Sequence, residues 1–303
     1  MKFIYILFFL CVSLQLNAQQ GQTKSPKGSS KKEIRGYEKA IEYYSSRIKN
    51  QPLNASVYYN RAVAKSGLNN YQEAILDYNK AIELDSSDAI YYWGRGVAKF
   101  SLKKLEEAII DYDNAIKINP NDARVYSNRA LVKENLNNFK GAILDYNKAI
   151  ELDSTQPSIY YNRGVLREAL KIYPKAIKDY SKVIELNPTD AAAYYNRGNI
   201  KSTLEMHQSA FKDYNKAIRL NPNNPDYYYN RGIAKDDLKD YKAAIKDYSK
   251  VIELNPKDTS GYYNRGLSKY NLGEISSSCL DFKKAVKLGS LDAANLIKEY
   301  CPD

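Results

Sequence analysis

The sequence repeats itself with a period of 34 residues. The segment 228–256, YYNRGIAKDDLKDYKAAIKDYSKVIELNP, shows the repeating unit, and its YYNRG start recurs at Tyr194 and at Tyr160. Seven blocks follow one another without insertion or deletion: 55–88, 89–122, 123–156, 157–190, 191–224, 225–258 and 259–292. A fixed period of this length predicts a solenoid, in which each unit buries its apolar face against its neighbours.

Each block contains two apolar patterns of helical period. In the sixth block, steps of three and four connect Tyr241, Ala244, Ile245 and Tyr248, so these residues share one face of a helix. A similar pattern precedes it, and polar residues separate the two. The Asn-Pro pair after the second pattern ends that helix, because the residue before a proline avoids the helical region. Each block therefore predicts two antiparallel helices.

Small residues recur where the two helices of a block should approach closely. Position 8 of the block reads Ala62, Gly96, Ala130, Gly164, Gly198, Gly232 and Gly266. Position 20 reads Ala74, Ala108, Ala142, Ala176, Ala210, Ala244 and Ser278. Glycine inside a helix costs about 1 kcal/mol relative to alanine, so its recurrence indicates a packing requirement.

These small residues, with aromatic residues at positions 4, 17 and 24, alanine at 27 and proline at 32, resemble the tetratricopeptide repeat over about four-fifths of the chain. The resemblance implies an all-α, right-handed superhelical solenoid of antiparallel helix pairs with seven full repeats. Residues 37–54 match the second half of a repeat, and we expect them to form an N-terminal half-repeat. Residues 293–303 should form a C-terminal capping helix and the chain end, since a terminal repeat must cover its apolar face.

Residues 1–18 have the pattern of a secretory signal peptide. A lysine precedes the apolar run 3–16, which is too short to span a membrane, and cleavage is expected after Ala18. The Asn-Ala-Gln ending resembles exported proteins of Bacteroidota. We predict a bacterial protein of the periplasm or the exterior, without a transmembrane segment after cleavage. A lipoprotein modified at Cys11 is the alternative, although Leu10 departs from the lipoprotein signal.

Residues 19–36 are polar and rich in Gly, Ser, Pro and basic residues, which predicts a flexible basic tail. It would serve as a spacer, or as an arm that contacts acidic polymers of the cell envelope. The formal net charge of the chain is +11. Export and the dispersed acidic residues nevertheless argue against a nucleic-acid partner.

The residue types that catalysis requires are scarce in the sequence. The single histidine, His207, takes position 17, where a packed aromatic residue is expected. No glycine-rich phosphate loop or nucleophile motif is present, and the cysteines have no neighbours with metal-ligand spacing. We therefore predict a protein that is not an enzyme and has no metal or cofactor.

The resemblance implies that the first helices line a concave groove. Positions 5 and 6 would place a tyrosine and an asparagine there in most repeats, which suits the backbone of an extended peptide. The alternative is that these side chains pack neighbouring helices. The predicted groove residues are Tyr59, Asn60, Trp93, Val97, Phe100, Asn128, Tyr161, Asn162, Tyr195, Asn196, Tyr229, Asn230, Tyr263 and Asn264.

The second repeat departs from the others at this face. It places the only tryptophan, Trp93, at position 5 and replaces the asparagine of position 6 with Gly94. Trp93, Val97 and Phe100 share one helix face. We predict that Trp93 anchors a ligand and that Gly94 gives the ligand backbone room. Alternatively, Trp93 packs against the first repeat, and Gly94 only avoids a clash.

Position 11 is basic in every repeat: Lys65, Lys99, Lys133, Arg167, Lys201, Lys235 and Lys269. Peptide-clamp members of the family hold a terminal carboxylate with groove lysines, but these lie elsewhere in the repeat. We therefore expect a solvated basic row.

Every repeat carries Arg at position 7 and Asp at position 23, and the half-repeat lacks both. We predict structural ion pairs between the two helices of a repeat, in which the guanidinium meets the carboxylate. The pairs are Arg61 and Asp77, Arg95 and Asp111, Arg129 and Asp145, Arg163 and Asp179, Arg197 and Asp213, Arg231 and Asp247, and Arg265 and Asp281.

Cys279 and Cys301 are expected to form a disulfide. They lie at equal distances on either side of the turn near Ser290, so antiparallel helices would bring them level, and export supplies an oxidising compartment. Two buried free thiols are the alternative.

These patterns together predict an exported scaffold that binds a protein or peptide segment. A module that binds carbohydrate or another envelope polymer is one alternative. A structural array that associates with itself through its end caps is a second, and a homo-oligomer would fit it.

Overall fold

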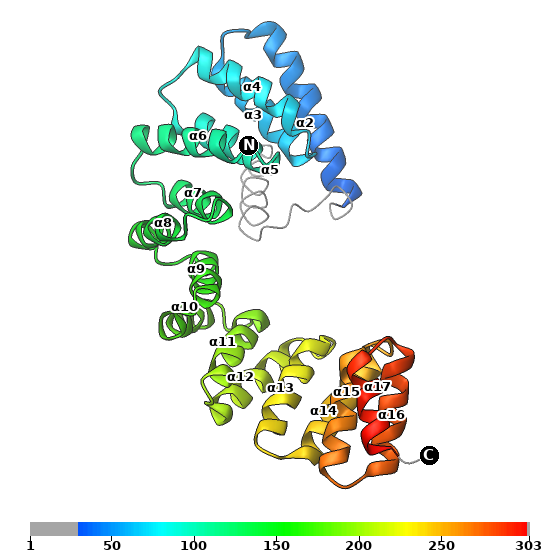
Figure 1. Cartoon of the computed structure of the whole chain (residues 1–303). Helices are drawn as coiled ribbons and strands as arrows, with labels where there is room; N and C mark the ends of the chain where they lie inside the picture. Colours follow the sequence, from blue (N-terminus) through cyan, green and yellow to red (C-terminus); the bar gives the residue numbers. More distant parts are fainter. Residues whose placement is uncertain (1–29, 302–303) are drawn as a thin grey trace. The chain divides into compact units, whose positions relative to one another are not determined.

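The computed structural model describes residues 30–301. The predicted signal peptide and most of the predicted tail lie outside the described residues. Between residues 30 and 301 the chain forms sixteen helices, α2 to α17, and no strand (Figure 1). The predicted all-α fold of paired antiparallel helices is confirmed.

Each 34-residue block forms one helix pair. The first helices are α3 (Ala55–Gly67), α5 (Ala89–Ser101), α7 (Ala123–Asn135), α9 (Pro157–Ala169), α11 (Ala191–Thr203), α13 (Pro225–Asp237) and α15 (Thr259–Asn271). The second helices are α4 (Tyr71–Leu84), α6 (Leu105–Ile118), α8 (Phe139–Leu152), α10 (Tyr173–Leu186), α12 (His207–Leu220), α14 (Tyr241–Leu254) and α16 (Ile275–Lys287). Helix α2 (Lys31–Asn50) precedes the array, and α17 (Leu291–Tyr300) follows it.

The helices belong to two compact units, Met1–Leu166 and Arg167–Asp303. Within each unit, a first helix packs on the second helix of its own repeat, and that helix packs on the next repeat. In the first unit α3 packs on α4 and α4 on α5, and in the second unit α13 packs on α14 and α14 on α15. Each repeat thus buries its apolar faces against its neighbours, as expected for a solenoid.

The core of each repeat is the aromatic residue at position 24. Tyr214 and Phe282, for example, are buried to 99% or more. A Cβ atom at Gly198 would lie 2.9 Å from Cε1 of Tyr214, and one at Gly266 would lie 2.6 Å from Cε1 of Phe282. Position 8 is small because the ring from the second helix lies directly on the first helix.

The turn within each repeat uses a left-handed residue at position 15. Six of these residues are not glycine and have φ between 57° and 62°: Asn69, Lys103, Asn137, Lys171, Glu205 and Lys239. The seventh is Gly273, with φ of 85°. The amide of position 16 donates to the carbonyl of position 11, as Asp240 does to Lys235 over 2.9 Å. This pattern satisfies carbonyl groups at the end of the first helix.

The prediction of an irregular tail as far as Gly36 is wrong for residues 31–36, because α2 begins at Lys31. Ser30 and Glu33 form a capping box, in which the Ser30 amide donates to the Glu33 carboxylate and the Glu33 amide donates to Ser30 Oγ. The Ser-x-x-Glu spacing at this point is the sequence signal for that start.

Candidate functional site

The arginines of position 7 bind the aspartates of position 23 within the same repeat. Nε and Nη2 of the guanidinium donate to the two carboxylate oxygens over 2.6–3.2 Å. This geometry joins Arg61 to Asp77, Arg95 to Asp111, Arg129 to Asp145, Arg197 to Asp213, Arg231 to Asp247, and Arg265 to Asp281. Arg163 and Asp179, the seventh predicted pair, belong to different units.

The basic residues of position 11 bind the same aspartates, so the expectation of a solvated basic row is wrong. The lysine Nζ atoms lie 2.7–2.9 Å from a carboxylate oxygen, and Arg167 Nη1 lies 2.6 Å from Asp179. Positions 7 and 11 are four residues apart and therefore share one helix face. Most of these aspartates thus bind two cations. The four-residue spacing between the basic residues of positions 7 and 11 is the sequence signal for this shared contact.

Each arginine of position 7 also reaches the preceding repeat. Arg197 Nη1, for instance, donates to Ser181 Oγ over 2.9 Å, and the guanidinium lies 5.7 Å from the ring centre of Tyr194. Burial lowers the pKa of Arg129, but its hydrogen bond to Asp145 raises it, and the net shift is upward. The cluster joins three helices and serves packing and register.

The asparagines of position 6 bind tyrosines of the preceding repeat in the second unit. Asn230 Nδ2 donates to Tyr195 Oη over 2.7 Å, and Asn264 Nδ2 donates to Tyr229 Oη over 2.8 Å. Among the predicted groove residues, Tyr59, Trp93 and Asn128 are buried. The others are half-buried: Asn60, Val97, Phe100, Tyr161, Asn162, Tyr195, Asn196, Tyr229, Asn230, Tyr263 and Asn264. The residues of positions 5 and 6 therefore contribute to the stacking of repeats.

The prediction that Trp93 is an open anchor is wrong. Only 6% of the residue is exposed, and the guanidinium of Arg124 lies 5.1 Å from its ring centre. Gly94 does not leave room for a ligand either, since a Cβ atom there would lie 2.6 Å from Cε1 of Tyr78. Neighbouring side chains of the chain itself cover this position.

Half-buried acidic residues at position 12 accept hydrogen bonds from buried tyrosines of the same repeat, which the sequence predictions did not include. The hydroxyl groups of Tyr146, Tyr180 and Tyr248 donate to Glu134, Glu168 and Asp236, over 3.3, 2.6 and 2.8 Å respectively. Burial raises the pKa of all three carboxyl groups. The recurring distance of twelve residues between acid and tyrosine is the signal that the sequence offers.

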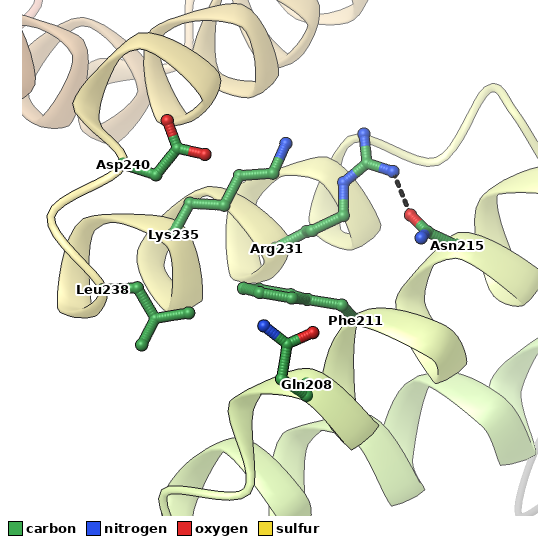
Figure 2. Close-up of a pocket in the computed structure, with 7 residues that line it drawn as sticks. All are labelled: Gln208, Phe211, Asn215, Arg231, Lys235, Leu238 and Asp240. Carbon is green, nitrogen blue, oxygen red and sulfur yellow. Dashed lines mark hydrogen bonds between the residues drawn. The ribbon is translucent and has the colours of Figure 1, made fainter.

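A pocket of about 360 Å³ opens between α12 and α13 (Figure 2). It is lined by Gln208, Phe211, Asn215, Arg231, Lys235, Leu238 and Asp240. Phe211 and Leu238 supply apolar walls, whereas Arg231 donates to Asn215. Arg231 and Lys235 also bind Asp247. Position 21, which Phe211 occupies, is isoleucine in five other repeats. The pocket therefore offers one apolar surface with polar groups around it.

Cys279 and Cys301 are joined by a disulfide that connects α16 to the end of α17, with 5.7 Å between the Cα atoms. His207, the first residue of α12, is half-buried. Among residues 30–301 there is no group of three or more side chains that could hold a metal ion. No helix in that part of the chain is long and apolar enough to cross a membrane.

Comparison with protein families gives matches to the tetratricopeptide repeat at residues 55–88, 157–190, 191–224 and 225–258, and to the TPR repeat at residues 96–137 and 135–171. The chain belongs to the tetratricopeptide-repeat family. A search of curated proteins gave no match.

Several solved structures resemble the chain. The C-terminal part of a TPR repeat-containing protein from Cytophaga hutchinsonii has a TM-score of 0.70 and 21% identity, and the match covers 78% of this chain and 98% of that one. YrrB, described as a TPR protein with an unusual peptide-binding site, has a TM-score of 0.51 and 26% identity over 60% and 94%. The MamA protein has a TM-score of 0.53 and 26% identity over 60% and 96%.

Proposed function

We propose that this protein is a non-enzymatic scaffold, exported to the cell envelope, that binds a protein or peptide segment along its first helices. The hydrogen bonds of two asparagines support this proposal most directly. Asn230 and Asn264 are oriented by hydrogen bonds from Nδ2, while their Oδ1 atoms accept no hydrogen bond within the described residues. Such amide oxygens can accept from the backbone N–H groups of an extended peptide.

The surroundings of these asparagines also suit a peptide. Tyr195 and Tyr229 lie beside them, half-buried, and offer apolar area with few rotatable bonds. The unusual peptide-binding site of YrrB supports the same class of ligand, because that protein is built from the same repeat.

Selection from a displayed peptide library tests this function. Peptides selected on the wild-type chain should bind Asn230→Ala/Asn264→Ala at least about tenfold more weakly, since two backbone hydrogen bonds of about 1 kcal/mol each are lost. Asn223→Ala, in an exposed loop, is the matched control. Circular dichroism must show an unchanged helix content. Equal binding by the wild type and the double variant would contradict the proposed groove.

An acidic carbohydrate or another envelope polymer is the second candidate, and the net charge of +11 favours it. Defined acidic oligosaccharides, offered in place of the peptides, distinguish the two ligands. If they bind the wild type but not the double variant while no peptide is selected, the glycan function replaces the peptide function.

Export is supported by the signal-peptide pattern of residues 1–18 and by the disulfide, since disulfides persist in oxidising compartments. Cell fractionation and N-terminal mass analysis test it, and a mature chain that begins at Gln19 is expected. A cytoplasmic chain that retains Met1 would contradict export.

A further inference from the structure

The second helices of the two units carry opposite charge. Helices α4, α6 and α8 of the first unit contain nine acidic and four basic residues, whereas α10, α12 and α14 of the second contain nine basic and five acidic residues. In both sets the three aspartates of position 23 are buried partners of first-helix cations, which leaves six acidic and four basic residues in the first set and two acidic and nine basic residues in the second. The accessible surface of the second set is therefore strongly basic.

Position 22 shows the same division at the exposed face of the second helices, which we call the outer face. In the first unit it holds Leu76, Ile110 and Leu144, whose exposed fractions are 60%, 59% and 60%. In α10, α12 and α14 of the second unit it holds Lys178, Lys212 and Lys246, all exposed, whereas the last repeat has Leu280, which is 69% exposed. A row of exposed aliphatic side chains in three successive repeats is typical of an interaction surface.

Ile110 has the acidic surroundings that a basic partner requires. Glu106 lies one turn before it and Asp113 nearly one turn after it, and both are exposed, although Asp113 also accepts a hydrogen bond from Arg129 Nη1 over 2.6 Å. Glu107 is also exposed, although it lies 3.5 Å from Lys104. The outer face of α6 thus presents an apolar residue between carboxylates.

The second unit offers the complementary arrangement. The pocket of Figure 2 has apolar walls at Phe211 and Leu238. Gln208, which also lines the pocket, occupies position 18 of its repeat and connects the rim of the pocket to the outer face. Lys212 and Lys246 follow on the second helices beside it, one in each repeat. A volume of about 360 Å³ is sufficient for one aliphatic side chain.

We propose that the outer face of α4, α6 and α8 in one copy of the protein binds the outer face of α10, α12 and α14 in another copy, with Ile110 entering the pocket beside Phe211. A second copy of the protein fits because the two faces carry opposite charge and because both are built on the same 34-residue repeat. Each copy keeps one free face of each kind, so association is head-to-tail and forms a chain or a closed ring. This inference does not depend on the proposed peptide function.

An exchange of surface residues between α6 and α14 tests the proposal. Glu106 and Lys242 both occupy position 18, and Ile110 and Lys246 both occupy position 22. The acidic-face variant is Glu106→Lys/Ile110→Lys, and the basic-face variant is Lys242→Glu/Lys246→Ile. Each introduced residue already occurs at the same repeat position elsewhere in the chain, so both variants should fold. Glu38→Lys/Glu42→Gln on α2 adds the same three charges as the acidic-face variant and is the control.

Analytical ultracentrifugation of the full mature chain across the micromolar range should show oligomers for the wild type and for the control. Each variant alone should be monomeric at the same concentrations. An equimolar mixture of the two variants should form a dimer and nothing larger, because only one competent face remains on each copy. High salt should dissociate the wild-type oligomer, since the exposed charges are then screened.

A wild-type chain that stays monomeric throughout this range would overturn the proposal. Oligomers that persist in both variants would also overturn it, because association would then use another surface such as the end caps. A mixture that remains monomeric, although each variant is folded by circular dichroism, would show that the two faces do not bind each other.

Discussion

At the scale of single residues, the aspartate of position 23 is the most constrained charged group of the repeat. Asp247 is 3% exposed and binds both Arg231 and Lys235. A buried ion pair contributes little relative to an apolar replacement, but removing one partner leaves the other charge without compensation. Here one carboxylate compensates two cations.

Replacing this carboxylate should be costly. We expect Asp247→Ala to lower the free energy of unfolding by about 3–5 kcal/mol, because Arg231 and Lys235 lose their shared partner. Denaturant unfolding followed by circular dichroism measures the change, and Asp237→Ala, at the end of α13, is the control. A loss below about 1 kcal/mol would mean that solvent compensates the cations.

The half-buried acid at position 12 makes stability depend on pH. Burial raises the pKa of Asp236 above 3.8, although hydrogen bonds from Ser268 and Tyr248 lower it in part. The folded state therefore holds this proton more tightly than the unfolded state. Its contribution to stability is complete below pH 3.8 and is lost as the pH rises through the folded pKa.

We accordingly expect Asp236→Asn to remove part of the decline in stability as the pH rises from about 4. Asparagine can still accept from Ser268 and Tyr248 but cannot ionise. Melting temperatures of the wild type and the variant over this pH range give the difference. If Asp236→Asn gives a parallel curve, the carboxyl titrates identically in both states.

At the scale of single elements, the turns contain strained backbone and the capping helix is restrained by a disulfide. Six turns place a residue with a Cβ atom at positive φ, which costs about 1–2 kcal/mol each relative to the right-handed region. Helix α17 covers the last repeat, and the Cys279–Cys301 disulfide holds its end against α16.

A glycine in one of these turns should stabilise the protein. Glu205 has φ of 58°, so Glu205→Gly should raise the free energy of unfolding by about 0.5–1 kcal/mol. Ser209→Gly, inside α12, should lower it by a similar amount. Thermal unfolding of the two variants checks the opposite signs, and a loss of stability in both would show that the Glu205 side chain has a role of its own.

Removing the disulfide should loosen the capping helix. The bridge joins residues 22 apart in sequence, so Cys301→Ser should cost roughly 3 kcal/mol in the chain-entropy model. Hydrogen exchange should rise mainly in α17. Cys279→Ile/Cys301→Ser, which restores the residue of five other repeats at position 21, should recover part of the loss. Unchanged exchange in α17 would mean that its packing alone holds it.

At the scale of the whole molecule, each repeat of a solenoid is stabilised by the repeats next to it, so stability is expected to be local. Tyr248 is 1% exposed and lies in the core of its repeat. Tyr248→Ala should therefore raise hydrogen exchange in α13, α14 and α15 but not in α3 and α4. Exchange followed peptide by peptide shows the pattern, and a uniform rise along the chain would indicate that the array unfolds as one cooperative unit.

The sequence by itself determined the repeat and the chemistry that recurs with it. Period, spacing and proline positions predicted the helix pairs, because a helix face is defined by steps of three and four residues. Small residues at position 8 predicted close contact, and in the structure the aromatic ring of position 24 lies there. The recurrence of Arg and Asp sixteen residues apart likewise pointed to the contacts that Arg231 and Asp247 make.

Only the tertiary structure decided what covers each face and which groups share a partner. Sequence spacing placed Trp93 on the groove side, but Arg124 and the surrounding core cover it. Lys235 was expected to be solvated, yet it binds Asp247, which lies between the two helices. The pocket beside Phe211 forms where one repeat meets the next. Burial and shared contacts depend on side chains that meet across helices, and the order of residues along one helix does not contain that information.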